Sequence, residues 1–217
     1  DSSADINIDV ECGAELRVLH LVTNHSSMNI AVAVAQDAQC KMTQVVVSPS
    51  DTRVVASLME CGARFELGGV FVLTDEDQAS VTVDVNHIAS DCQSHTSVKG
   101  VAADKAHGSF SGLVYVAPGA QHTDSVQSSR NVTIGEARIE TLPQLEIYAD
   151  DVKCSHGATV GQMDSDAILY MRQRGLSLAD AKRLQIEGFV DDVVLHSVVA
   201  GSEEILAELL AEKLNRL

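Results

Sequence analysis

The feature that most limits the fold of this chain is a series of short apolar or alternating runs, which start about every 12 to 15 residues. Turn-forming residues separate the runs, for example Ser48–Asp51 and Pro118-Gly119. Short strands at such regular spacing are typical of a β-sandwich, a β-barrel or a β-solenoid. We expect strands at Leu16–Thr23, Asn29–Ala35, Thr43–Val47, Arg53–Leu58, Phe65–Leu73, Val81–Val85, Thr96–Val101, Gly108–Val116, Val126–Ile134, Arg138–Tyr148 and Val152–Val160.

The residue composition also favours sheet over helix for most of the chain. Hydrophobic residues make up 45% of the 217 residues, aromatic residues make up 3%, and Trp is absent. The core must therefore consist of Val, Ile, Leu and Ala, and β-branched side chains fit well on a pleated sheet. Because no fixed residue motif repeats along the chain, the runs alone do not distinguish a sandwich from a solenoid.

The pattern changes after Met163, where apolar residues begin to recur at helical spacing. We expect three helices, the first of which ends at Gly175. The residues expected to cap the first two are Asp164 or Ser165 for the first helix and Ser177 with Asp180 for the second, and the third helix is expected to start near Ser202. We therefore predict a β domain over residues 1–162 and a small C-terminal α-helical domain over residues 163–217.

The charge of the chain argues against two classes of partner. The formal net charge is −16, whereas nucleic-acid binding needs clustered Lys and Arg. The same charge disfavours adhesion to anionic membranes. The longest apolar run, Met28–Ala35, contains an Asn and is far too short to cross a bilayer. We expect neither a nucleic-acid partner nor a membrane partner.

The cysteines indicate a reducing compartment. There are five, an odd number, with no Cys-x-x-Cys pair and no tight spacing pattern. A disulfide framework is therefore not expected, and reduced thiols in a cytoplasmic protein are the simpler interpretation. The sequence also lacks the motifs of several enzyme classes: it has no phosphate-binding loop, no dinucleotide-binding glycine motif and no serine-hydrolase elbow.

The most informative residues for chemistry lie between Pro143 and Gly161, in the sequence PQLEIYADDVKCSHGATVG. Successive side chains of a strand point to opposite faces, so Cys154 and His156 should share one face. A thiol and an imidazole side by side can hold a metal or form a nucleophile–base pair. The alternative is that Cys154 is a small buried hydrophobe and His156 an edge histidine.

A second group of potential ligands consists of His87, Cys92, His95 and His107. These side chains would converge only if stacked coils brought their strands together. No closed metal-ligand spacing supports that arrangement, so we favour separate polar residues on turns and strand faces. The adjacent carboxylates Asp150-Asp151 would point in opposite directions on a strand, and we expect them to end the strand in a turn.

The segment PQLEIYADDVKCSHGATVG, followed by MDSDAILYMRQRGLSLADA, resembles the SufB/SufD family of iron–sulfur cluster assembly scaffolds. The part KCSHGATVG is the SufD form, and the Glu-His-Glu-Ala-Thr of the SufB form is absent. The match is dense from about Asn86 to Gly188. The resemblance implies a right-handed parallel β-helix, in which each coil buries its inward side chains on the coils beside it.

The resemblance also implies a function and partners. A SufD-type subunit is expected to be a non-catalytic scaffold that pairs with a SufB-like subunit and binds a SufC-like ATPase. The histidine that matches His156 faces the SufB-like subunit, near the place where a cluster forms, and Cys154 is the second candidate ligand. We therefore expect no stably bound cofactor, but a transient iron–sulfur cluster shared with the SufB-like subunit.

The C-terminal helices of the family are expected to hold the ATPase, and Arg172, Arg174 and Gly175 are the matched positions. Family members carry a helical region before the core, so we expect this chain to be the C-terminal part of a longer protein. Two alternatives remain open at this point. One is a β-solenoid enzyme acting on a polysaccharide, and the other is a metal-free homodimeric β protein. Exposed strand edges at the end of a solenoid also predict a homodimer for the isolated chain.

Overall fold

The computed structural model describes residues 2–195 and 197–215, which form twelve β-strands and three α-helices. The odd-numbered strands form one sheet, the odd sheet, in the order β1 (Ser2–Val10), β3 (Ser26–Val34), β5 (Ser50–Leu58), β7 (Gln78–His87), β9 (His107–Val116) and β11 (Arg138–Ile147). The even-numbered strands form the even sheet, in the order β12 (Lys153–Gly161), β10 (Asp124–Thr133), β8 (Gln93–Ala102), β6 (Arg64–Leu73), β4 (Gln39–Val46) and β2 (Glu15–Val22). The helices are α1 (Ser165–Gln173), α2 (Leu178–Leu195) and α3 (Glu203–Leu214).

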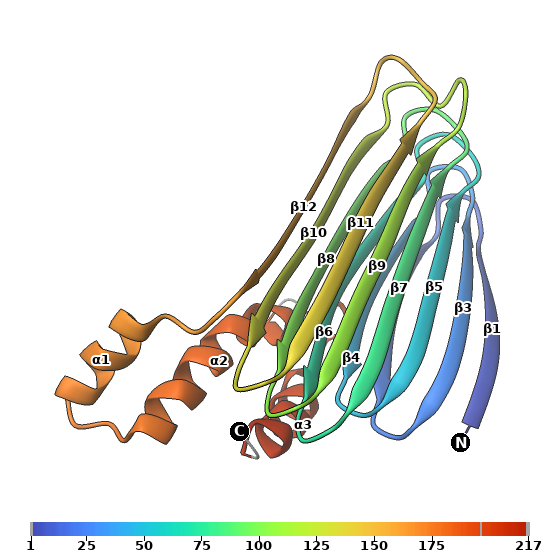
Figure 1. The fold of residues 1–217 in the computed structure, drawn as a ribbon. Coiled ribbons are helices and arrows are strands. Elements are labelled where there is room, and N and C mark those ends of the chain that lie inside the picture. Colours follow the sequence, from blue (N-terminus) through green and yellow to red (C-terminus); the bar gives the residue numbers. More distant parts are fainter. Residues whose placement is uncertain (1, 196, 216–217) are drawn as a thin grey trace.

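The chain alternates between the two sheets, and every strand runs parallel to its neighbours in the same sheet (Figure 1). One odd and one even strand make a coil, and the coils stack in register. The number of residues between neighbours in register gives the length of one coil. The coil from Ser2 of β1 to Ser26 of β3 is shorter than the coil from Asp124 of β10 to Lys153 of β12, so the coils are longer near the C-terminal end of the solenoid. The predicted parallel β-solenoid with a C-terminal helical region is therefore confirmed.

All eleven predicted runs fall on strands, from β2 to β12. The first strand, β1, lies outside the predicted runs because only Ile6, Ile8 and Val10 carry its alternation among polar residues. The strands end at Gly161 and the first helix begins at Ser165. The division into two domains stays a prediction, because α2 and α3 share a hydrophobic cluster with the even sheet.

The turns that lead from odd to even strands stack on one another, and most place one residue in the left-handed backbone region. Asp37, Gly62, Asp91 and His122 occupy this position with φ values of 53°, 76°, 61° and 58°. Asp and Gly are the residues that adopt this conformation most readily. A Cβ atom on Gly62 would lie 2.2 Å from Asp37 Oδ1 in the neighbouring turn, so the stack also requires a small residue there.

The interior of the solenoid changes in character along its length. The inward side chains of β6 are apolar, and the fully buried ones are Phe65, Leu67, Phe71 and Leu73. Two coils further on, the inward side chains of β10 are polar, namely Ser125, Gln127, Ser129 and Asn131, and they are no more than 3% exposed. Burial of polar groups costs stability unless they are hydrogen-bonded, so this polar row needs an explanation.

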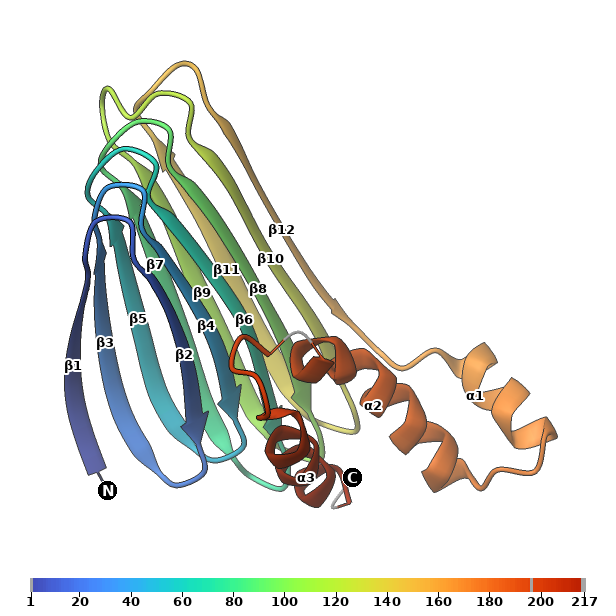
Figure 2. The same cartoon turned by 180° about the vertical axis from the view of Figure 1, so that it is seen from behind.

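Helices α2 and α3 lie across the outer face of the even sheet (Figure 2). The buried side chains of this layer are Val45, Val47, Val70, Val72 and Val101 from the sheet and Ile186, Val190, Val193, Leu206, Leu210 and Leu214 from the helices. Two largely buried lysines hold the helices to the solenoid, one on strand β8 and one that reaches the turn between β6 and β7. Lys99 Nζ lies 2.5 Å from Asp192 Oδ1, and Lys213 Nζ lies 2.5 Å from Asp77 Oδ2.

The predicted caps of the first two helices and the predicted start of the third near Ser202 are confirmed, although the Ser202 side chain makes no capping hydrogen bond. Asp164 accepts hydrogen bonds from the first turn of α1, and Gly175 follows that helix with φ of 98°. The Asp180 backbone N–H donates to Ser177 Oγ at 3.0 Å, and Ser202 precedes α3. Helix α1 has no buried residue and projects away from the solenoid (Figure 1). Within the described ranges, no helix combines the length and apolarity that a bilayer crossing needs.

Candidate functional site

The last coil of the solenoid, formed by β11 and β12, presents unpaired strand edges. β12 pairs with β10 on one side, and β11 pairs with β9 on one side. Neither has a neighbouring strand on its other side within residues 2–195 and 197–215. The backbone N–H and C=O groups along these edges are therefore available to pair with another chain.

Cys154 and His156 lie on the same face of β12, as the strand period predicts. Cys154 is in register with Ser125 of β10, and His156 is in register with Gln127. Both β10 residues are buried, so this face of β12 looks into the solenoid. The two predicted site residues thus belong to the inner row of the last coil.

The two side chains have different environments. Cys154 is half-buried and packs against the hydrophobic cluster of Val114, Val116 and Ala120. Burial raises the pKa of the Cys154 thiol, and the nearby Asp124 carboxylate raises it further. His156 is exposed and makes no hydrogen bond or ion pair within the part of the chain that the structure describes.

The inner row of β12 is open where the inner row of β10 is closed. Val160 is 47% exposed, whereas Asn131, its neighbour in register on β10, is 3% exposed. His156 and Ala158 are exposed in the same way. These positions face inward by strand geometry but have no further coil to cover them. The end of the solenoid is therefore an uncovered interior surface.

A buried chain of hydrogen bonds leads toward Cys154 from the odd sheet. His87 Nε2 lies 2.9 Å from Ser94 Oγ, and Ser94 Oγ lies 2.7 Å from Ser125 Oγ. The next side chain in register after Ser125 is Cys154. Burial lowers the pKa of His87 to about 4, so its ring is neutral at neutral pH.

The other predicted ligands do not converge, as we favoured from the sequence. His87 is buried inside the solenoid, whereas His95 is exposed on the outer face of β8. Cys92 is buried in a turn, where its Sγ donates to Glu60 O at 3.2 Å. His107 starts β9 and lines a recess on the odd sheet. Among the described residues, no three His, Cys, Asp or Glu side chains form a group that could hold a metal ion.

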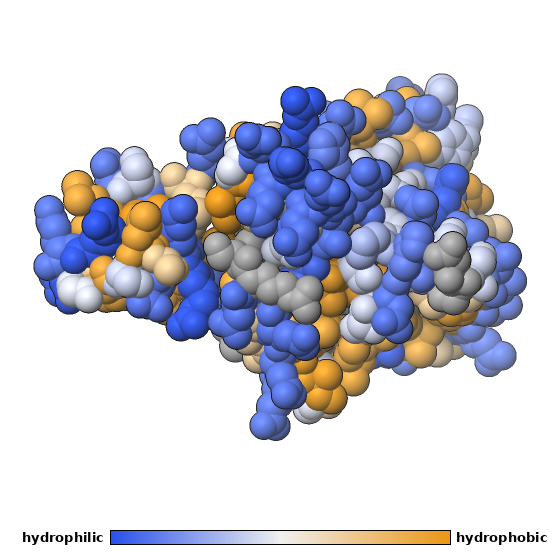
Figure 3. Space-filling model, turned by 60° about the horizontal axis from the view of Figure 1, so that its bottom comes forward, coloured by the Kyte–Doolittle hydropathy of each residue, from blue (hydrophilic) through white to orange (hydrophobic). Residues whose placement is uncertain are grey.

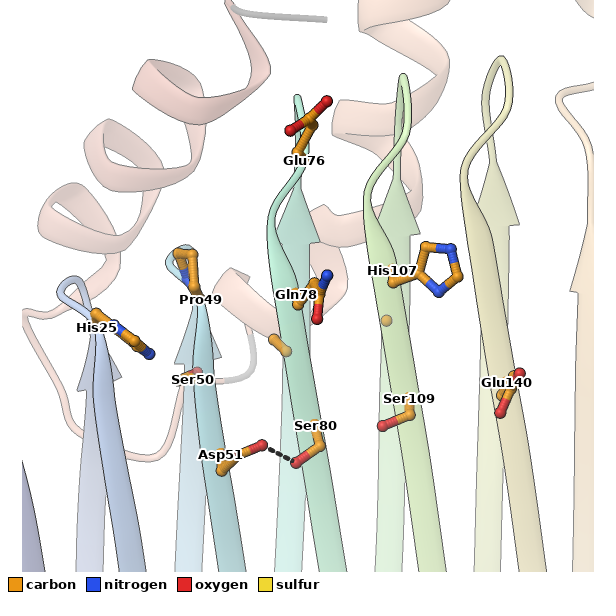
Figure 4. Close-up of a pocket in the computed structure, with 12 residues that line it drawn as sticks. His25, Pro49, Ser50, Asp51, Glu76, Gln78, Ser80, His107, Ser109 and Glu140 are labelled. Atoms are coloured by element: carbon orange, nitrogen blue, oxygen red, sulfur yellow. Dashed lines mark hydrogen bonds between the residues drawn. The ribbon is translucent and has the colours of Figure 1, made fainter. Parts of the chain in front are cut away.

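That recess, of about 550 Å³, lies on the outer face of the odd sheet (Figure 4). Asp51 and Glu140 contribute carboxylates to it, and Asp51 Oδ1 accepts a hydrogen bond from Ser80 Oγ at 2.6 Å. The register runs from Asp51 through Ser80 and Ser109 to Glu140, which is three strand spacings or about 14 Å. Glycosidase carboxylates are about 5 to 9.5 Å apart, so this pair does not support the polysaccharide enzyme.

The residues predicted for ATPase binding lie at the tip of the projecting helices. Arg172 and Arg174 are exposed, and the Arg174 guanidinium lies over the Tyr170 ring at 4.4 Å from its centre. Gly175 connects α1 to the segment before α2. Leu169 and Tyr170 on α1 are more than half exposed. Figure 3 shows hydrophobic side chains among hydrophilic ones on this projecting part, at the left of the view.

One arrangement near the site was not predicted from the sequence. His122 lies in the turn stack between two carboxylates, with Nδ1 3.0 Å from Asp91 Oδ1 and Nε2 3.4 Å from Asp151 Oδ2. Asp151 and Asp150 occupy the turn before β12, as expected. The sequence does contain an indication of this cluster, because Asp91, His122 and Asp151 follow one another at intervals of about one coil length. Recognising it requires the coil length to be known first.

A family model described as "SUF system FeS cluster assembly, SufBD core domain" matches residues 2–189. The iron–sulfur cluster assembly protein SufD of Escherichia coli (strain K12) is 43% identical over 110 residues, which cover 50% of this chain and 26% of that protein.

Two further relatives match a larger share of the chain. The iron–sulfur cluster assembly protein SufD of Bacillus subtilis (strain 168) is 30% identical over 145 residues, covering 66% of this chain and 33% of that protein. An iron–sulfur cluster assembly SufBD family protein of Mycobacterium bovis is 27% identical over 207 residues, covering 90% of this chain and 51% of that protein. The chain thus spans about half the length of these curated relatives, or less.

Proposed function

The chain belongs to the SufBD core family of the SUF system for FeS cluster assembly, and from this premise we propose that it is a SufD-like, non-catalytic scaffold subunit. In this proposal a SufB-like subunit covers the open end of the solenoid, and a SufC-like ATPase binds the projecting helices. The single observation that carries the proposal is the uncovered inner row of β12, which presents His156 at a free sheet edge.

The free edges support a partner that continues the two sheets. Strand edges pair readily with strands of another chain, because the backbone hydrogen bonds of the edge are otherwise made only to water. A subunit with a similar solenoid would cover His156, Ala158 and Val160 with its own inward side chains. Burial of the exposed Val160 side chain would then add hydrophobic stabilisation to the backbone pairing.

The side chains at this end fit a transiently held iron–sulfur cluster. Imidazole nitrogen and thiolate sulfur are both iron ligands. This chain offers two such groups, His156 and Cys154, whereas a stable cluster site takes about four. The remaining ligands would come from the SufB-like subunit, so the cluster would be a cargo shared between subunits and released when they move apart.

The projecting part of the chain supports the second contact. Arg172, Arg174 and Gly175 match the positions at which the family pattern places ATPase binding, and all three are exposed or lie in an exposed connection. Since α1 buries none of its residues in this chain, its apolar side chains Leu169 and Tyr170 are available to a partner. Movement of the ATPase would thus reach the solenoid through α2, which is fixed to the even sheet by Lys99.

The test is reconstitution with the SufB-like and SufC-like subunits of the same source. We expect His156→Ala to keep the fold and the complex but to lower the iron and sulfide content that the complex acquires. His95→Ala is the matched control, because His95 is also exposed on the even sheet but faces outward. A normal cluster yield from His156→Ala would contradict the ligand role. Light scattering on the same samples before mixing should show the isolated chain as a homodimer formed through its free edges.

A further inference from the structure

The two free edges at the open end of the solenoid do not offer the same backbone groups. In a parallel sheet the N–H and C=O groups of one residue point to one side of the strand, and those of the next residue point to the other side. Arg138 N–H donates to Ala106 O and Tyr148 N–H donates to Val116 O, so the even-numbered residues of β11 pair with β9. The backbone groups that face the free edge therefore belong to the odd-numbered residues, Ile139, Thr141, Pro143, Leu145 and Ile147.

Pro143 lies in the middle of this free edge and has no N–H to donate. The other two prolines, Pro49 and Pro118, lie outside the strands. Because the missing donor of Pro143 faces the free side, it costs β11 no hydrogen bond to β9, and edge strands tolerate proline in this orientation. The β11 edge thus has its donors in two separate pairs, Ile139 with Thr141 and Leu145 with Ile147.

The free edge of β12 has no such gap. Lys153 N–H donates to Thr123 O, so the odd-numbered residues of β12 pair with β10. The even-numbered residues present both N–H and C=O to the free edge, and they are Cys154, His156, Ala158 and Val160. A second strand can therefore form an uninterrupted ladder with β12, whereas a ladder with β11 would break at its centre.

Charge increases this difference where two copies of β11 would meet. Glu140 and Glu146 are exposed, and they lie at equal distances in sequence on either side of Pro143. An antiparallel pairing centred on Pro143 would place each Glu140 opposite Glu146 of the second copy, and like charges directly opposite are destabilising. It would also leave both Pro143 carbonyl oxygens without a donor. On β12 the outward positions beyond Lys153 are uncharged, namely Ser155, Gly157, Thr159 and Gly161.

We propose that Pro143 directs the SufB-like subunit to β12, so that an edge strand of that subunit pairs with β12 and the even sheet continues across the interface. The identity of the partner rests on the function proposed above. In this arrangement the backbone of His156 bonds directly to the partner strand, while the two subunits meet at β11 through side chains. Pro143 is thus a specificity-determining residue of the interface, because it removes the donor that a strand on β11 would need at its centre.

The first experiment measures amide hydrogen exchange, residue by residue, in the parent chain alone and in its complex with the SufB-like subunit. On binding, we expect exchange to slow by at least about 10-fold at the four edge amides of β12, and by less than about 3-fold at Thr141 and Leu145. The amides of Ser155, Gly157 and Thr159 are the internal control, because they are already bonded to β10 and should change little. Equal slowing on β11 and β12 would overturn the proposal.

The second experiment removes one further donor from each edge. Ala158→Pro interrupts the β12 edge, and Leu145→Pro is the matched control on β11, since both N–H groups face the free side and neither is bonded within its own sheet. We expect Ala158→Pro to weaken binding of the SufB-like subunit by about 10-fold, because a partner carbonyl oxygen loses its donor, and Leu145→Pro by less than about 3-fold. Calorimetric titration measures both affinities, and equal weakening would contradict the proposal. Thermal unfolding monitors the fold, and the exchange measurement on the parent chain decides the question if a variant does not fold.

The third experiment uses the isolated chain, so it does not depend on the proposed function. Pro143→Val restores the missing N–H, and we expect it to tighten self-association by about 3- to 10-fold, the factor for one hydrogen bond. Gln144→Val is the matched control, because it also adds a β-branched side chain to β11 but its N–H is already bonded to β9.

Sedimentation equilibrium measures the self-association of the parent chain and of both variants. Unchanged self-association in Pro143→Val, or an equal increase in Gln144→Val, would overturn the role of Pro143. A parent chain that does not bind the SufB-like subunit would contradict the proposed function instead, so the two proposals can fail separately.

Discussion

Strands β6 and β10 occupy equivalent places in the even sheet, but their inner rows have opposite character. Phe65, Leu67, Phe71 and Leu73 fill the interior at β6, and Ser125, Gln127, Ser129 and Asn131 fill it at β10. Both rows are almost fully excluded from water, so burial alone does not explain the difference. The middle of the solenoid is built for stability, whereas the end next to His156 keeps polar groups that a simple core would not retain.

The polar row is partly satisfied within itself. Asn131 Nδ2 donates to Ser129 Oγ at 2.9 Å, and Ser125 is bonded to Ser94. Oxygen atoms of Gln127 and Asn131 stay unpaired among the described residues. Three predictions test whether the two rows differ in the way that this reasoning requires.

The largest effect is expected at β6. Phe71 fills the space left by two glycines, since a Cβ atom on Gly100 or Gly108 would lie 2.2 Å or 2.6 Å from its ring. Phe71→Ala should lower the free energy of unfolding by about 3–5 kcal/mol, because it leaves a large cavity. Ser129→Ala on β10 should cost about 1 kcal/mol, the value of one hydrogen bond. Urea unfolding measures both, and equal losses would remove the distinction between the rows.

A smaller effect is expected from pH, through the buried His87 at the polar end. Burial lowers the pKa of His87 to about 4 from its ordinary value of 6.5. Above pH 6.5 the ring is neutral in both states. As the pH falls from about 6.5 to about 4, the unfolded chain binds a proton that the folded chain does not, so the free energy of unfolding falls by about 3 kcal/mol.

The control for this pH effect is His87→Leu, which matches Leu58, the neighbour of His87 in register. Most of the loss between pH 6.5 and pH 4 should disappear in this variant. Part of it should persist through His20, because burial lowers the pKa of that ring as well. A pH dependence that is identical in the parent chain and in His87→Leu would show that His87 is not the group responsible.

The smallest effect is expected from Ser94, which connects His87 to Ser125. Ser94→Ala removes the bonds of 2.9 Å and 2.7 Å and leaves buried polar atoms on both sides, so we expect a loss of about 1–2 kcal/mol. Ser97→Ala on the same strand should cost less, about 0.5 kcal/mol, because Ser97 faces outward and loses only the part-buried hydrogen bond that its Oγ accepts from Ser128 Oγ at 3.2 Å. Chemical denaturation measures the free energy of unfolding of both variants. A loss in Ser97→Ala as large as that in Ser94→Ala would argue against a stabilising series of hydrogen bonds through Ser94.

Local patterns in the sequence were sufficient to predict eleven of the strands, the caps of the first two helices and the shared face of Cys154 and His156. These features depend on contacts between residues close in the chain, where the strand period of two and the capping rules apply. The choice of a solenoid over a sandwich came from the family pattern, and β1 lay outside the prediction because its only large apolar residues are Ile6, Ile8 and Val10.

The contacts of the candidate site could not be derived in the same way. His156 lies in register with Gln127, a whole coil away in the sequence, and His87 is hydrogen-bonded to Ser94 across a turn between the sheets. Such pairs follow only from the coil length, and that length is not constant, because the coils between β9 and β11 are longer than those between β1 and β3. The alternation of β12 showed that two side chains share a face, but it did not show that this face looks inward.

The change in coil length gives the molecule a direction. The coil that joins β10 to β12 contains more residues than the coil that joins β1 to β3, and the two trace loops of different circumference. The rod therefore widens toward the end that carries His156. Identical copies laid head to tail would bring a narrow rim against a broad one, and their edge strands would fall out of alignment. A tapered solenoid therefore does not favour head-to-tail growth into fibres. Its wide last coil still fits the wide last coil of another solenoid, because the two have the same circumference.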